Sequence, residues 1–98
     1  MRYSNKHIYY NVIFMKRIKL NEYKPNMGIL IDVRHPEDYK KDPIPGSINI
    51  YADKLLMNYK TMLVKNKKYY ITCKKGVLSK KVVSMLEFYG YDVTQIIH

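Results

Sequence analysis

Short β-prone runs alternate with helix-type segments along most of this chain, and this order restricts its fold more than any other feature. Continuous apolar runs predict buried strands, whereas apolar residues at helical spacing predict helices. The predicted strands are 29–31, 47–51, 69–72 and 91–97; the predicted helices are a short one from Pro36, 53–64 and 79–89. Strands that alternate with helices usually pair in parallel. We therefore expect an α/β fold, a three-layer single domain whose central, mostly parallel sheet of about five strands is flanked by helices.

Proline and glycine set the limits of these segments. Pro43 and Pro45 keep the helix from Pro36 short and make 42–46 a rigid turn. Gly90 is typical of the residue that follows the end of a helix. A strand or turn is expected at 18–23.

The first residues of the chain carry a weaker pattern. Ile8, Tyr10 and Val12 alternate with polar residues, which predicts a strand, yet the same stretch also suits a disordered leader. We therefore divide the chain into an N-terminal extension, 1–17, that is either strand or disordered, and a domain over 18–98.

Composition narrows the classes of protein. The 98 residues suffice for one domain, and no run approaches the roughly 20 apolar residues of a membrane span. The formal net charge is +10, and all but three of the 18 basic residues are lysine. This charge has two readings, an AT-rich genome or an electropositive surface, but no nucleic-acid-reading motif accompanies it. One cysteine permits no internal disulfide, so we expect a cytoplasmic protein. Because the chain has neither a membrane-length apolar run nor a nucleic-acid-reading motif, we expect it to bind neither membrane nor nucleic acid.

That cysteine, Cys73, lies between the predicted strand 69–72 and the predicted helix. A thiolate is stabilised there by the helix N-terminus and by backbone amides that a turn at Gly76 can direct inward. Nearby lysines add positive charge: Lys74, Lys75, Lys80 and Lys81. The alternative is that Cys73 is only a small buried apolar residue.

Two further motifs precede the cysteine turn. In chain order the three motifs are Leu30-Ile-Asp-Val-Arg34 followed by Pro-Glu-Asp-Tyr, then Ile44-Pro-Gly-Ser-Ile-Asn-Ile50, then Cys73-Lys-Lys-Gly-Val-Leu-Ser79. Together, in this order, they resemble a rhodanese-like (sulfurtransferase) domain. The resemblance covers 18–97. It implies a parallel sheet with helices on both sides and an active-site cysteine that carries sulfane sulfur.

In this reading Cys73 is the nucleophile and carries the sulfur as a persulfide, which it passes to a thiol or cyanide. The resemblance assigns the persulfide-binding loop to Lys74, Lys75, Gly76, Val77, Leu78 and Ser79. Ser79 would also cap the helix. The sulfur donor would be a small anion such as thiosulfate, or a protein persulfide or thiol partner. No metal or organic cofactor is implied.

The chain departs from the family pattern. Leu78 stands where many active members carry an arginine, so Lys74, Lys75 or Lys80 would have to bind an anion instead. Asp42-Pro43 replaces the usual Gly-His, and the chain ends at His98. These departures concern substrate and turnover, and they motivate an alternative, a catalytically weak binding module that docks a protein partner.

Other residues have competing interpretations. Asp32 and Arg34 either support the chemistry or anchor loops by ion pairing. A cysteine-dependent phosphatase or arsenate reductase would need an arginine six residues after the cysteine, where this chain has Ser79.

Overall fold

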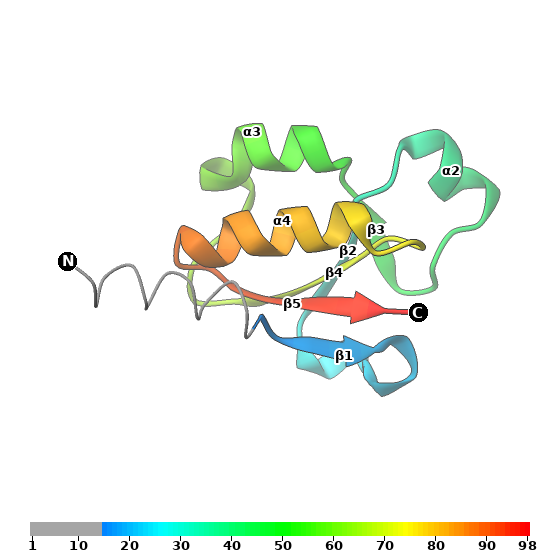
Figure 1. Cartoon of the computed structure of the whole chain (residues 1–98), viewed down its shortest axis with the longest axis horizontal. Coiled ribbons are helices and arrows are strands. Elements are labelled where there is room, and N and C mark those ends of the chain that lie inside the picture. The colour runs from blue at the N-terminus through cyan, green and yellow to red at the C-terminus, as the bar shows by residue number, and fades with distance from the viewer. Residues whose placement is uncertain (1–14) are drawn as a thin grey trace.

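A five-stranded parallel sheet forms the centre of the computed structural model, which describes residues 15–98 (Figure 1). The strands are β1 (Arg17–Lys19), β2 (Ile29–Asp32), β3 (Ser47–Asn49), β4 (Lys68–Thr72) and β5 (Asp92–Ile97). They lie in the order β1-β5-β4-β2-β3, and all four neighbouring pairs are parallel. The expected α/β fold with a parallel sheet is confirmed.

Helices and short turns cover the two faces of this sheet. The α-helices are α2 (Pro36–Lys41), α3 (Ala52–Met62) and α4 (Val77–Phe88), and the 3-10 helices are Leu20–Glu22 and Pro25–Met27. In Figure 1, α3 and α4 lie together on one side of the sheet. The opposite face is packed by apolar residues from β1 and the 3-10 segments. That layer is therefore made of turns rather than long helices.

The apolar runs of the sequence form the buried centre. Ile31 and Ile71 are neighbours in the register of β2 and β4 and are almost fully buried. They pack with Val82, Val83 and Leu86 of α4 in the larger core cluster. Because all strands are parallel, β2, β4 and β5 end at the same edge of the sheet, where α2 also lies (Figure 1).

Several boundaries differ from the sequence prediction. Helix α4 begins at Val77, not at Ser79, because Gly76 takes a left-handed conformation (φ 85°) that lets the turn enter the helix directly. Ser79 lies inside the first turn and does not cap the helix, so that prediction was wrong. Strand β3 ends at Asn49, and α3 begins soon after, at Ala52.

The strand predicted from Ile8, Tyr10 and Val12 lies outside the described residues. Within residues 15–98, no helix has both the length and the apolar character needed to cross a bilayer.

Gly28, directly before β2, approaches the neighbouring strand too closely for a side chain. A Cβ atom there would lie 2.5 Å from the carbonyl oxygen of Lys68 and 2.9 Å from Cε1 of Tyr70. We expect Gly28→Ala to lower the free energy of unfolding by about 1–3 kcal/mol, because the two strands must separate locally. Urea denaturation measures this change. Met57→Ala, at an exposed position, serves as the control, and a Gly28→Ala protein as stable as that control contradicts the prediction.

Candidate active site

Cys73 follows β4 directly and is buried, with 3% of its surface exposed. The backbone amide of Ser79 donates a hydrogen bond to its Sγ atom over 3.1 Å. The thiol in turn lies 3.3 Å from the Ser79 hydroxyl, to which it can donate. The turn after β4 thus brings the first turn of α4 back onto the sulfur, where an amide dipole can stabilise negative charge.

Gln95 of β5 supports this turn from beneath, a role that the sequence did not reveal. Its side-chain Nε2 donates to the carbonyl oxygen of Gly76 over 3.1 Å and to the Ser79 hydroxyl over 2.9 Å. Ser79 Oγ is also 3.3 Å from the Gly76 oxygen. The only available signal was a glutamine within the predicted strand 91–97, and periodicity does not indicate which loop such a residue contacts.

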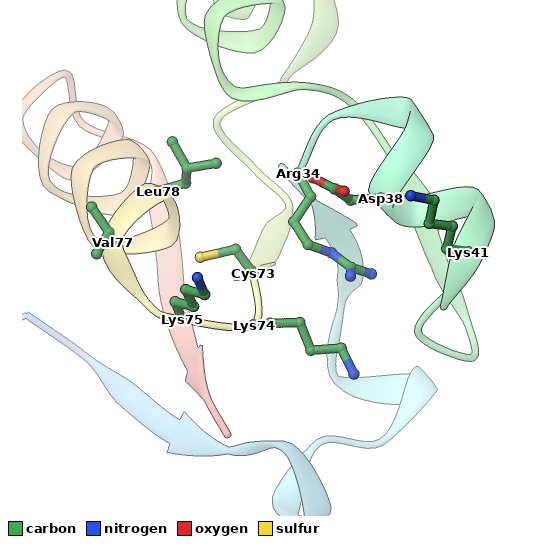
Figure 2. Close-up of a pocket in the computed structure, with 8 residues that line it drawn as sticks. All are labelled: Arg34, Asp38, Lys41, Cys73, Lys74, Lys75, Val77 and Leu78. Atoms are coloured by element: carbon green, nitrogen blue, oxygen red, sulfur yellow. The ribbon is translucent and has the colours of Figure 1, made fainter.

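A pocket of about 440 Å³ opens beside Cys73 (Figure 2). Its lining comes from both sides of the sheet edge: Arg34, Asp38, Lys41, Cys73, Lys74, Lys75, Val77 and Leu78. Figure 2 shows Cys73 between Leu78 on α4 and Arg34 near the end of β2. The structure therefore gathers the cysteine turn and the Asp32-Arg34 segment around one cavity.

Arg34 is anchored by internal partners through Nε and Nη2, whereas its Nη1 has no hydrogen-bond partner within residues 15–98. Its guanidinium makes a bidentate pair with Asp32, including Nη2 to Oδ2 at 2.7 Å, and Nη2 also donates to the Asp42 carbonyl over 2.8 Å. The hydrogen bonds that Arg34 donates to the Asp32 carboxylate raise the pKa of Arg34. Asp32 is fully buried and does not line the pocket. This geometry favours the loop-anchoring interpretation of the two residues.

The lysines of the cysteine turn have different surroundings. Lys74 pairs with Asp42 (Nζ to Oδ2, 2.6 Å), and its side chain extends away from Cys73 in Figure 2. The hydrogen bond to Lys74, followed by that lysine's charge, lowers the pKa of Asp42. Lys75 and Lys41 line the pocket and have no ion-pair partner within residues 15–98. Lys80 does not line it; it borders a separate surface depression along α4.

His98 lies beneath the end of β4. Its Nε2 is 2.7 Å from the hydroxyl of Thr72, the residue before Cys73. Burial, and then the charges of Lys74 and Arg34, lower the pKa of His98. An ordinary histidine has a pKa of about 6.5, so a lowered pKa favours the neutral imidazole at pH 7, which adds no positive charge near the cysteine.

Among residues 15–98, no three histidine, cysteine, aspartate or glutamate side chains gather in a way that could hold a metal ion.

The buried Asp32–Arg34 pair yields a stability prediction. We expect Asp32→Ala to lower the free energy of unfolding by about 3–5 kcal/mol, because it leaves the arginine charge buried without its partner. The double variant Asp32→Ala/Arg34→Met should lose less, since neither charge remains. Chemical denaturation of both proteins tests this, and a single variant more stable than the double would contradict the anchoring interpretation.

Comparison with known proteins agrees with the fold and with the motifs that meet at the pocket. The model of the rhodanese-like domain family matches residues 14–98. A rhodanese-like domain protein from Staphylococcus aureus is 34% identical, with a TM-score of 0.70 over 85% of each chain. A Staphylococcus saprophyticus protein is 28% identical, with a TM-score of 0.75 over 85% of this chain and 87% of that one. No curated protein matches the chain.

A larger protein also contains a similar unit. The reduced CoADR-RHD protein of Bacillus anthracis is 34% identical over 85% of this chain, with a TM-score of 0.74. The match spans only 15% of the length of that protein. The family model covers nearly all of the present chain, and the solved structures share its fold. The chain therefore belongs to the rhodanese-like domain family.

Proposed function

We propose that this protein is a sulfurtransferase that carries a sulfane sulfur as a persulfide on Cys73 and passes it to a thiol or cyanide. One observation carries the proposal: the Cys73 sulfur borders a pocket and accepts a hydrogen bond from the backbone amide of Ser79, in the first turn of a helix. Family membership supports the same chemistry. A thiolate held there is a nucleophile with an anion-stabilising environment.

In the first step the Cys73 thiolate attacks the outer sulfur of the donor. A new S–S bond forms at Sγ while the S–S bond of the donor breaks, and the donor leaves with the electron pair, as sulfite or as a thiolate. The backbone from Lys74 to Ser79 is the proposed cradle for the persulfide. Preoriented amide dipoles that face the terminal sulfur would stabilise its negative charge.

In the second step an acceptor thiolate or cyanide attacks the terminal sulfur. The new bond to the acceptor forms as the Cys73–sulfur bond breaks, and Sγ leaves again as a thiolate. The two displacements add no net electrons to the protein, so this cycle needs no resident redox cofactor.

The lining of the pocket favours a donor other than free thiosulfate. Leu78 offers no charge, and Lys74 is paired with Asp42. Arg34 uses Nε and Nη2 for Asp32 and Asp42, so only Nη1 is left for a ligand and the guanidinium cannot act as a bidentate clamp. Lys75 and Lys41 are strongly hydrated point charges. We therefore propose a persulfide on an organic thiol or on a protein as the natural donor, with thiosulfate as a poor substitute.

Sulfur loading tests the central proposal. After incubation with a persulfide donor, or with excess thiosulfate, the intact protein should gain the mass of one sulfur atom, and reduction by a thiol should remove it. Cys73→Ser should gain nothing, because the hydroxyl forms no persulfide. If neither donor adds mass to the wild-type protein, or if Cys73→Ser gains the same mass, the sulfurtransferase proposal is wrong.

Leu78→Arg tests why thiosulfate is a poor donor. The new guanidinium can hydrogen-bond the anionic end of thiosulfate, so we expect kcat/KM with thiosulfate to rise about tenfold or more. Phe88→Arg is the matched control, since it adds the same charge at an exposed position of the same helix that does not line the pocket. Equal increases in both variants would show a general charge effect and would contradict the role given to Leu78.

A second candidate function is a binding module with little turnover. Leu78 and the ion pair between Lys74 and Asp42 favour it, because both leave the pocket with few groups that can bind an anion. Absence of sulfur on Cys73 with every donor, in both wild-type protein and Leu78→Arg, would support this alternative.

A further inference from the structure

The hydrogen-bond network behind Cys73 offers the Gly76 carbonyl more donors than this carbonyl needs. The Gly76 carbonyl has three donors within reach: the Lys80 amide at 3.1 Å, Gln95 Nε2 at 3.1 Å and the Ser79 hydroxyl at 3.3 Å. Cys73 Sγ also lies 3.3 Å from the same hydroxyl. Ser79 thus stands between two acceptors, and the lone pairs of one of them, the Gly76 oxygen, are already taken by Lys80 and Gln95.

The orientation of the Gln95 amide is fixed by this geometry. A carbonyl oxygen only accepts, so the atom of Gln95 that faces Gly76 must be the NH2 nitrogen. Its second hydrogen points to Ser79 Oγ at 2.9 Å. The hydroxyl therefore accepts from Gln95 and keeps its own proton for either Gly76 or the sulfur. Gln95 is 4% exposed, so water does not readily replace it.

We propose that Gln95 is a positioning residue that releases the Ser79 hydroxyl to stabilise the Cys73 thiolate. While Cys73 is a thiol, its S–H donates to Ser79 Oγ, and the hydroxyl proton points to the Gly76 carbonyl. When the thiol loses its proton, the hydroxyl rotates and donates to Sγ, and Gln95 keeps the Gly76 carbonyl satisfied. No covalent bond changes in this rotation.

The role of this switch in catalysis rests on the proposed sulfur transfer. Sγ is a thiolate twice in that cycle, as the attacking nucleophile and as the leaving group. In both states the Ser79 hydroxyl would add a second donor to the Ser79 amide. Without Gln95, only the Lys80 amide would donate to the Gly76 oxygen, and its second lone pair would be open to the Ser79 hydroxyl. That bond would compete with donation from the hydroxyl to Sγ.

The pH profile of Cys73 alkylation by iodoacetamide tests the inference without any sulfur transfer. Gln95→Met keeps the length of the side chain and removes its donors, so we expect the profile to move to higher pH and the rate at pH 7 to fall about tenfold. Ser79→Ala should change the profile in the same direction. The double variant should react no more slowly than Ser79→Ala, because Gln95 acts through that hydroxyl.

Thr94→Val controls for general loosening of β5, since Thr94 points to the opposite face of the strand and should leave the profile unchanged. If Gln95→Met does not fold, Gln95→Asn replaces it; its shorter amide cannot reach both acceptors and should shift the profile in the same direction. Superimposed profiles for the folded Gln95 variant and wild type overturn the inference, as does an additive double variant. A shifted profile supports it even if no sulfur loads onto Cys73, in which case only the sulfurtransferase proposal fails.

Discussion

The ion pair between Asp32 and Arg34 determines how one wall of the pocket is built. A carboxylate that is fully buried at the end of β2 is tolerable only with its charge matched and its oxygens hydrogen-bonded, and Arg34 meets both needs. The same guanidinium holds the Asp42 carbonyl, while Asn49 of β3 donates to the carbonyls of Asp32 and Arg34. Two strands and the loop between them are locked together. The arginine beside the cysteine is consequently a structural part of the wall.

The opposite wall is held by neutral hydrogen bonds. Gly76 turns the chain into α4, Gln95 fastens that turn to β5, and Ser79 presents its amide to Cys73. The groups seen to touch the sulfur are therefore an amide and a hydroxyl, with lysines placed around the pocket. Such a division suits a carrier of sulfur: dipoles stabilise the anion in place, and the outer cations can attract a charged donor or partner.

The alternation of strands and helices was predictable because each element has a local signature. Apolar runs identified β2 and β4, and helical spacing identified α3 and α4, since burial on one face imposes a period on the sequence. The strand order β1-β5-β4-β2-β3 was not predictable in this way. Strand pairing depends on contacts between distant segments. The hydrophobic period within one segment carries no information about those contacts. The start of α4 was misplaced because Ser79 resembles a cap, although the left-handed Gly76 already closes the turn.

The sequence by itself determined that a cysteine, a glycine turn and a helix follow one another, and that the Asp32-Arg34 segment ends a buried strand. Which charges face the cavity depends on the tertiary structure: Lys74 and Lys75 both line it, Lys74 is also paired with Asp42, and Lys80 borders another surface. It alone brought Gln95 beneath the cysteine turn. The physical reason is that local chain order fixes backbone conformation over a few residues. The partner of a long or buried polar side chain is instead chosen by whatever donors and acceptors the folded sheet places within reach.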